Sequence, residues 1–361
     1  MTQKILISTG GSGGHVVPAT ILYEHLKNQF QVYMTTDDRG MKFLDKDKYN
    51  LEIINVPPIS KNIFLLPFQF FLLIYFIIKS IFFLKKKGID ILISTGGYMS
   101  LPLCLASKIL NIKLFLFEPN MVLGRSNKFF IKSCKKIFCY SDKIKNFPNK
   151  YMDKINVIPA LLRKKFYKIE KAQGINDYIN LLVIGGSQGA KIFDTLTKTL
   201  VVKLSKKYNL KIYQQTNLVN FENLKQFYKD NNINNELFDF NEDISNFMSR
   251  SNMCLTRAGA TTLAELVFLN LPFVAIPLPT SKDNHQFENA FFYNKIGCNW
   301  ILNENEINDE YIASKLLNII DNKDEYLIKK MNMKNFSYQN TWNNINQKII
   351  SVINENRISK N

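Results

Sequence analysis

Histidine, tryptophan and cysteine are scarce in this 361-residue sequence, with three, two and five residues respectively. The cysteines are odd in number and lack CxxC spacing, which argues against a disulfide framework and a zinc ribbon. They are Cys104, Cys134, Cys139, Cys254 and Cys298. We expect buried thiols in a reducing compartment. The N-terminal apolar run is too short for the core of a secretory signal peptide, so we expect a cytoplasmic protein.

Arginine is also scarce, although the net charge is +17. The sequence lacks the interleaved arginines and aromatics of a nucleic-acid module and any zinc-finger spacing, so nucleic acid is disfavoured as a partner. The charge suits an anionic membrane surface or a phosphorylated substrate. A solvated surface rich in lysine explains much of it equally well.

The length favours two domains, and 46% apolar residues suffice for two cores. A strand, a glycine turn and a helix follow one another from "KILISTGG" at 4–11, and the pattern returns at 90–102 and 179–194. This alternation predicts an α/β fold with doubly wound parallel sheets. We expect Rossmann-like domains at 1–162 and 163–340 facing a cleft, a linker around 142–178, and a C-terminal helix at about 341–361 that packs back on the first domain.

Three glycine loops follow predicted strands, at 10–14, 96–98 and 185–189. Glycine lets the backbone approach an anion closely, and a helix N-terminus adds partial positive charge. None of the loops matches the dinucleotide fingerprint or the Walker loop, which argues against NAD and ATP hydrolysis. Packing of a helix on a sheet is the alternative explanation for each loop taken singly.

His15 lies at the first turn of a predicted helix, where the helix dipole disfavours a charged imidazole. A neutral imidazole accepts a proton from a hydroxyl, which suits activation of an alcohol nucleophile. A helix-capping histidine is the alternative.

The densest polar cluster of the second half covers 256–290. Thr261 and Thr262 are candidate helix caps, and Glu265 lies one turn onward, where a carboxylate accepts hydrogen bonds from sugar hydroxyls. Gln286 and Asn289 are three apart and share one helix face. Each alone is compatible with ordinary surface.

The apolar stretch 63–84 is long enough to cross a bilayer. A single crossing would separate the first glycine loop from the second and split one sheet. We therefore expect a helix partly packed on the first domain, with its other face on anionic headgroups. The expected membrane contacts are Phe71, Ile74, Ile78, Lys85, Lys86 and Lys87. A fully buried helix and a transmembrane helix are the alternatives.

Six motifs occur in one order along the chain: "GGSGGHVVPA", "STGGYMSLP", "EPNMVLGRSNK", "VIGGSQGA", "TRAGATTLAEL" and "PLPTSKDNHQFENA". With them the sequence resembles the bacterial GT-B glycosyltransferases of peptidoglycan synthesis that transfer N-acetylglucosamine (GlcNAc) to lipid I. The resemblance implies UDP-GlcNAc as donor, lipid I as acceptor, lipid II as product, and no cofactor or metal. It also implies a peripheral enzyme on the cytoplasmic face of the inner membrane.

The resemblance carries roles to individual residues. Those implied around the acceptor are His15, Tyr98, Glu118 and Asn127. Those implied to contact the UDP-sugar are Ser12, Gly13, Gly14, Asn120, Arg163, Ser187, Gln188, Ile244, Arg257, Ala260, Thr261, Thr262, Leu263, Ala264, Glu265, Gln286 and Asn289. The chain departs from the family pattern at "IPALLRKK", which replaces a Gly-Asn-Pro before the arginine, and at Pro119, which replaces a glutamine.

The implied reaction is an inverting transfer in which the MurNAc hydroxyl attacks the anomeric carbon while UDP leaves. Helix N-termini and loop amides would stabilise the charge developing on the diphosphate. "DKD" at 45–47 imitates the metal motif of another glycosyltransferase fold, but its charged context predicts solvated surface. The alternatives are another GT-B enzyme, such as a glycolipid glycosyltransferase or a UDP-GlcNAc 2-epimerase, and a non-catalytic basic protein that binds membranes.

Overall fold

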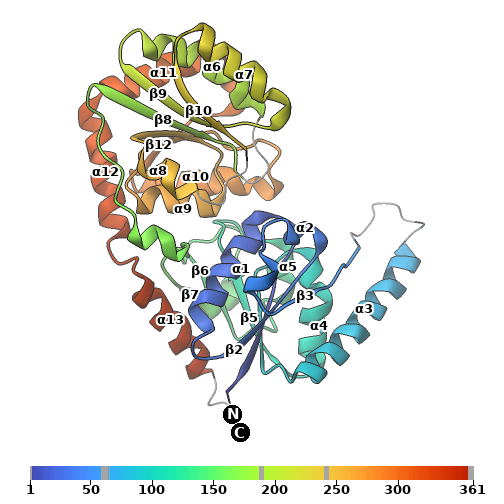
Figure 1. Ribbon diagram of the computed structural model, residues 1–361. Helices are drawn as coiled ribbons and strands as arrows, with labels where there is room; N and C mark the ends of the chain where they lie inside the picture. Colours follow the sequence, from blue (N-terminus) through green and yellow to red (C-terminus); the bar gives the residue numbers. More distant parts are fainter. Residues whose placement is uncertain (1, 58–63, 65, 187–190, 240–243, 357–361) are drawn as a thin grey trace. The chain divides into compact units, whose positions relative to one another are not determined.

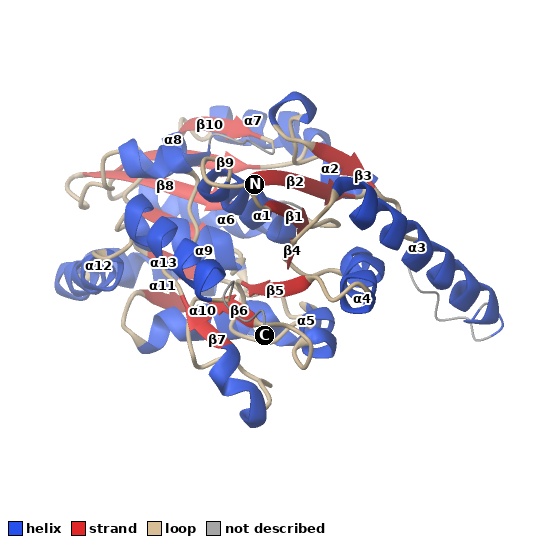
Figure 2. Cartoon of the chain, turned by 90° about the horizontal axis from the view of Figure 1, so that it is seen from below, coloured by secondary structure: helices blue, strands red, loops and turns tan. Residues whose placement is uncertain are grey.

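The computed structural model describes residues 2–57, 64, 66–186, 191–239 and 244–356. The chain divides into two compact units (Figure 1). Unit 1 comprises Met1–Leu161 and Trp342–Asn361, and unit 2 comprises Leu162–Thr341. Each unit is a parallel sheet with helices on both faces (Figures 1 and 2), which confirms the predicted α/β class.

The sheet of unit 1 has seven parallel strands in the order β3-β2-β1-β4-β5-β6-β7. Its strands are β1 Lys4–Ser8, β2 Gln31–Thr36, β3 Leu51–Ile53, β4 Ile91–Ser94, β5 Lys113–Glu118, β6 Lys136–Cys139 and β7 Ile155–Val157. Its α-helices are α1 Gly13–Leu26, α2 Asp38–Met41, α3 Leu66–Lys87, α4 Leu101–Ile109, α5 Arg125–Phe130 and α13 Trp342–Glu355. Its described 3-10 turns include η1 Lys46–Lys48, η3 Tyr98–Ser100 and η4 Asn149–Lys154.

The sheet of unit 2 has six parallel strands in the order β10-β9-β8-β11-β12-β13. They are β8 Tyr178–Ile184, β9 Asn209–Gln215, β10 Asn234–Phe238, β11 Met253–Thr256, β12 Phe273–Ala275 and β13 Asn299–Ile301. The α-helices are α6 Lys191–Ser205, α7 Leu218–Asp230, α8 Ile244–Ser249, α9 Ala260–Phe268, α10 His285–Lys295, α11 Asp309–Asp321 and α12 Lys323–Ser337.

The strand orders place the glycine loops at the points where each sheet reverses its winding. In unit 1 the reversal lies between β1 and β4, and in unit 2 it lies between β8 and β11. The loops after these strands contain "GGSGG", "GGY", Gly185–Gly186 and "RAG". Ligands bind at such switch points in open α/β sheets.

The central strands β1, β4, β8 and β11 are apolar and buried over nearly their whole length because helices cover both faces of each sheet. All five cysteines lie unbridged in these cores, as predicted. Burial raises the pKa of the Cys104 thiol to about 12. Such a thiol is an inert core side chain rather than a nucleophile.

The prediction that residues 142–178 form a linker is wrong for most of that stretch. It contains η4, β7 and a further 3-10 turn, Lys164–Lys168, and the division between the units falls within it, after Leu161. Prolines and lysines made it look like a linker, but β7 completes the first sheet. At the other end of the chain, α13 packs on α1 through the stacked rings of His25 and Trp342, with centroids 3.7 Å apart.

Helix α3 packs against α4 at the outside of unit 1, and Figure 2 shows it reaching out from the body of the unit. Its segment Pro67–Lys87 is long and apolar enough to cross a membrane, yet only 11% of an apolar 18-residue stretch within it is buried. The fully buried helix, one of the alternatives, is therefore wrong. The apolar side chains Phe71, Ile74 and Ile78 are 69%, 37% and 48% exposed.

Candidate active site

The first glycine loop of unit 1 leads directly into α1. Gly11 has a φ of +84°, which favours glycine, and Ser12 is the N-cap of the helix. In the described part of the chain, no side chain caps the first amides of α1, and Gly14 is exposed. The His15 N–H bonds to the Ser12 carbonyl oxygen at 3.0 Å, so the exposed Gly14 amide is the one in this turn best placed to meet a ligand.

The second glycine loop passes close to the first, and both of its glycines have left-handed backbone conformations. Gly96 and Gly97 have φ angles of +92° and +82°. A Cβ atom at Gly96 would lie 3.3 Å from His15 Cε1, and one at Gly97 would lie 3.5 Å from the carbonyl oxygen of Gly10. The backbone conformation favours glycine at both positions, and His15 leaves little room for a side chain at Gly96.

The hydrogen bond of His15 fixes its tautomer. Its Nδ1 lies 2.7 Å from the carbonyl oxygen of Thr95, and a carbonyl only accepts, so Nδ1 carries the proton. In the neutral ring the lone pair is therefore on Nε2. The ring is held in the orientation that a general base needs, and its neutral form in the tautomer that such a base needs.

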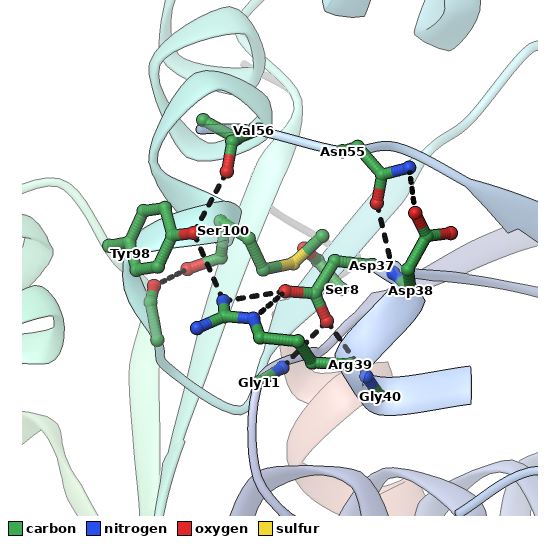
Figure 3. A network of polar contacts seen from close by, with 12 residues as sticks. Ser8, Gly11, Asp37, Asp38, Arg39, Gly40, Asn55, Val56, Tyr98 and Ser100 are labelled. Atoms are coloured by element: carbon green, nitrogen blue, oxygen red, sulfur yellow. Dashed lines mark hydrogen bonds and ion pairs between the residues drawn. The ribbon is translucent and has the colours of Figure 1, made fainter. Parts of the chain in front are cut away.

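A network that the sequence did not reveal holds this loop in place (Figure 3). Asp37 follows β2 and accepts hydrogen bonds from the Gly11 and Gly40 N–H groups at 2.8 and 2.9 Å. Arg39 pairs with Asp37 at 2.6 Å and donates to the Tyr98 hydroxyl at 3.0 Å. Burial raises the pKa of Asp37, but the bonds from Gly11, Arg39 and Gly40 outweigh it and hold that pKa below its usual value.

The Tyr98 hydroxyl also donates to the Val56 carbonyl oxygen at 2.9 Å. Burial raises the pKa of Tyr98 above its usual value, and Arg39 counteracts this in part. A protonated phenol fixed between two partners is suited to holding the loop rather than to accepting a proton.

Glu118 is a buried carboxylate, 2% exposed, that organises the loop after β5. Its Oε1 accepts from the backbone and side-chain N–H groups of Asn120, and its Oε2 accepts from Gly124 N and Asn127 Nδ2, at 2.8–3.2 Å. Asn127 also donates to the Phe117 carbonyl oxygen at 3.0 Å. Glu118, Asn120 and Asn127 thus hold the loop after β5 together. Because both carboxylate oxygens of Glu118 already accept hydrogen bonds within this loop, His15 is the better candidate for the general base.

In unit 2 the centre of the predicted site is an ion pair. Arg163 Nη2 lies 2.9 Å from Oε1 of Glu265, which is only 2% exposed. The predicted residues Arg163 and Glu265, 102 positions apart, are thus brought together. Glu265 is held on α9 with its carboxylate oriented by a cation.

Helix α9 begins at Ala260 with Gly259 as its N-cap. The prediction that Thr261 or Thr262 caps it is wrong, because the cap lies two residues before Thr261 and both threonines lie inside the first turn. Their side chains and Ala260 are partly exposed, whereas Leu263 and Ala264 are 0% and 3% exposed and pack in the core. Side-chain contacts from Leu263 and Ala264 to a ligand are therefore excluded.

Gln286 and Asn289 share one face of α10, as predicted, and both hold the turn before α9. Gln286 Oε1 accepts from the N–H groups of Ala258 and Leu278 at 3.2 and 3.0 Å. Asn289 Nδ2 donates to the Ala258 carbonyl oxygen at 3.2 Å. The side-chain oxygen of Gln286 and the side-chain nitrogen of Asn289 thus both bond to the turn before α9.

The Arg257 side chain is buried and bonded to other parts of unit 2. It is 8% exposed, donates to the Ile276 carbonyl oxygen at 3.1 Å and forms an ion pair with Glu304. Sequence reasoning missed Glu304, which lies 47 residues further along the chain. The guanidinium is better placed to brace the turn after β11 than to contact a ligand directly.

Two predicted residues, Ser187 and Gln188, lie outside the described residues. Ile244 is the first residue of α8 and is partly buried. Gly13 is buried at the start of α1.

Within the described residues no group of three or more His, Cys, Asp or Glu side chains is placed to hold a metal ion. The "DKD" motif lies at η1 and just before it, where Asp45 accepts a hydrogen bond from the Asp47 N–H at 3.1 Å on the exposed surface. The motif is a local turn of the kind expected of solvated surface.

Comparison with known proteins identifies relatives over nearly the whole chain. Models of the glycosyltransferase family 28 N-terminal and C-terminal domains match residues 5–139 and 180–348. The UDP-N-acetylglucosamine–N-acetylmuramyl-(pentapeptide) pyrophosphoryl-undecaprenol N-acetylglucosamine transferase of Pelagibacter ubique is 65% identical, over 99% of this chain and 100% of the relative. The transferase of the same name from Rickettsia canadensis is 34% identical, over 89% and 91%.

Solved structures share the fold. The structure of Acinetobacter baumannii MurG aligns with a TM-score of 0.76 at 22% identity, over 98% of this chain and 100% of that one. A UDP-GlcNAc 2-epimerase from Neisseria meningitidis aligns with a TM-score of 0.65 at 14% identity, over 98% and 100%. Together with the GT-B architecture and the sequence relatives, this shows that the chain belongs to glycosyltransferase family 28, among the pyrophosphoryl-undecaprenol N-acetylglucosamine transferases.

Proposed function

We propose that this chain transfers GlcNAc from UDP-GlcNAc to the MurNAc hydroxyl of lipid I, giving lipid II for peptidoglycan synthesis. The observation that carries this proposal is the 65% identity to a transferase of that name over 99% of the chain. The glycine loops at the switch points of both sheets supply the matching chemistry.

The donor is assigned to unit 2. The first turn of α9 presents backbone amides and the positive end of a helix dipole, which suit a diphosphate. Glu265, oriented by Arg163, is suited to accepting hydrogen bonds from ribose hydroxyls. Loop amides aimed at the leaving diphosphate stabilise the charge that develops there as the sugar departs.

The acceptor is assigned to the glycine loops of unit 1. The MurNAc hydroxyl oxygen forms a bond to the anomeric carbon as the bond from that carbon to UDP breaks. The proton of the hydroxyl passes to Nε2 of His15, the ring nitrogen that the bond from Nδ1 to Thr95 leaves with the lone pair. The attack inverts the anomeric centre because nucleophile and leaving group lie on opposite faces.

The other GT-B activities are less well supported. The epimerase likeness, at 14% identity, concerns the fold alone. An epimerase also has no need of an alcohol acceptor or of a general base paired with one. A non-catalytic basic protein would leave the tautomer-fixed His15 and the Arg163–Glu265 pair without a role.

The proposal is tested by incubating purified protein with UDP-GlcNAc and a short-chain lipid I analogue while UDP release is followed. We expect release only when both substrates are present, and an unchanged rate with EDTA, because backbone amides take the role of a metal at the diphosphate. Release that is independent of acceptor would contradict the transfer, and a complete loss with EDTA would contradict the amide mechanism.

We further propose that the enzyme is peripheral on the cytoplasmic face of the bacterial inner membrane. Five apolar side chains of α3 recur at helical spacing on one face and are 48–69% exposed: Phe68, Phe71, Tyr75, Ile78 and Phe82. Lys85 and Lys86 are exposed at its C-terminal end, and Lys87 lies over the ring of Tyr33 at 5.4 Å. An apolar stripe ending in lysines suits an anionic bilayer surface, where the polyprenyl acceptor also resides.

Replacing Phe71, Ile74 and Ile78 together with serine is expected to reduce association with anionic liposomes at least about tenfold, since each substitution removes exposed apolar area. Cosedimentation measures the change, and turnover of a soluble acceptor analogue should be retained. The matched control replaces Tyr178, Leu218 and Val219 of unit 2, which are 64%, 75% and 85% exposed. Equal binding by both triple variants would refute the membrane role of α3.

A further inference from the structure

The glycine turn Gly185–Gly186 after β8 is held by a side chain that sequence reasoning did not single out. Gln215, the last residue of β9, is 7% exposed. Its Oε1 accepts from the Gly185 N–H at 3.0 Å, and its Nε2 donates to the Gly186 carbonyl oxygen at 3.0 Å. One amide side chain therefore fixes both a donor and an acceptor of the turn.

The turn itself is built for close approach. Gly186 has a φ of +77°, a conformation that favours glycine. A Cβ placed there would meet no atom of the described residues within 4 Å, so none of those residues crowds this glycine.

The residues beside Gln215 are anchored to the helix that follows the loop. Asp194, on α6, accepts from Gln214 Nε2 at 3.1 Å and from the Thr216 hydroxyl at 3.1 Å. Asn220 adds a third bond to the same carboxylate at 2.7 Å. These hydrogen bonds connect the end of β9 to α6. They hold the backbone on both sides of Gln215 in place while its side chain bonds to the glycine turn.

In unit 1 the corresponding glycine turn is held by a charged side chain, Asp37. Asp37 follows β2 as Gln215 ends β9, and both hold the glycine turn after the neighbouring first strand of their sheet. The carboxylate of Asp37 is neutralised by Arg39 at 2.6 Å. Gln215 carries no charge to be neutralised, and unit 2 is the unit to which the anionic donor is assigned.

We propose that Gln215 is a positioning residue that shapes Gly185–Gly186 for the donor's diphosphate, and that its neutrality is required for this. The inference rests on the proposed function, because it assigns the diphosphate to this switch point. A carboxylate at position 215 would lose the bond to the Gly186 carbonyl and would place a negative charge beside an anionic ligand. The acceptor unit has no part in the effect.

The test compares Gln215→Glu and Gln215→Met with the wild type in steady-state assays that vary UDP-GlcNAc and the lipid I analogue separately. At pH 8 we expect the donor KM to rise about tenfold or more in Gln215→Glu and about fivefold in Gln215→Met, with the acceptor KM unchanged. At about pH 5.5 protonation of the carboxylate introduced by Gln215→Glu would restore a donor and remove the charge, so the donor KM ratio of this variant to wild type should fall. The ratio for Gln215→Met should stay constant.

Two titratable groups of the neighbouring cluster, Asp194 and Tyr228, are present in every variant, so the ratios isolate position 215. Gln226→Glu, the same change on the exposed surface of α7, is the matched control and should behave as wild type. Thermal unfolding checks that each variant folds, and if Gln215→Glu does not, Gln215→Met decides by its donor KM. Donor KM values within about twofold of wild type in the folded variants would overturn the inference. A wild-type enzyme that shows no turnover of UDP-GlcNAc would instead overturn the proposed function.

Discussion

Replacing His15 with alanine is expected to lower kcat by about 10²–10⁴-fold, the usual contribution of a positioned general base. The donor KM should change little, because the donor is assigned to unit 2. The Nδ1 bond to Thr95 at 2.7 Å leaves Nε2 as the basic nitrogen, and alanine removes it without disturbing the glycines around it. Steady-state kinetics with both substrates measure the split between kcat and KM.

The pH profile separates a catalytic from a merely structural His15. A protonated imidazole has no lone pair, so wild-type kcat should fall on acidification, and the residual activity of His15→Ala should lack that limb. His285→Ala is the matched control, since His285 Nδ1 also lies 2.7 Å from a carbonyl oxygen, that of Lys282. A His15→Ala enzyme with wild-type kcat would assign the proton to another group.

Replacing Glu265 with alanine is expected to raise the donor KM about 10²-fold, with the acceptor KM unchanged. The carboxylate is 2% exposed, and its loss removes the proposed ribose acceptor and also leaves Arg163 without its anionic partner. Isothermal titration with UDP should show the same loss of affinity. Glu265→Gln keeps the shape of the side chain and should show a smaller loss.

The surface pair of Arg250 and Glu236 provides the control for Glu265. It joins the same groups at 3.1 Å, but both side chains are about two-fifths exposed. Glu236→Ala should therefore change neither kinetics nor stability by more than a surface ion pair contributes, about 0–1 kcal/mol. UDP affinity that is lost equally in both variants would mean that Glu265 acts only through folding.

The sequence was sufficient for the features that depend on local pattern. Apolar runs closed by glycines predicted β1, β4 and β8, and their repetition predicted parallel sheets wound in both directions. The glycine loops were therefore expected at the carboxyl ends of the strands, where the turns of a parallel sheet lie at the same edge. The side chain of His15 was placed correctly at the start of α1 for the same reason.

Contacts between distant segments were beyond sequence reasoning. No local sequence pattern singles out Asp37 and Arg39, which the fold after β2 brings beside Gly11 and Tyr98. The family resemblance implied that Arg257 contacts the UDP-sugar, whereas its ion pair with Glu304, two strands later, could not be foreseen from the sequence. Which partner a buried charge finds depends on tertiary packing, which no local spacing encodes.

Helix boundaries were the other weakness. Threonine and glycine are about equally favourable as N-caps, so capping propensity alone does not decide between Gly259 and the threonines Thr261 and Thr262. The chain uses Gly259 instead, which places the helix start within the glycine turn that follows β11.

The central claim is that this enzyme moves a sugar from a nucleotide to a lipid-linked alcohol. The most direct measurement uses UDP-GlcNAc labelled in the sugar, with a short-chain lipid I analogue, and identifies the labelled product by mass and by the anomeric coupling constant. We predict one added GlcNAc per acceptor in the β configuration, inverted from the α-linked donor, with one UDP released for each. Label recovered as an epimerised or free sugar, or as an α-linked product, would contradict this claim.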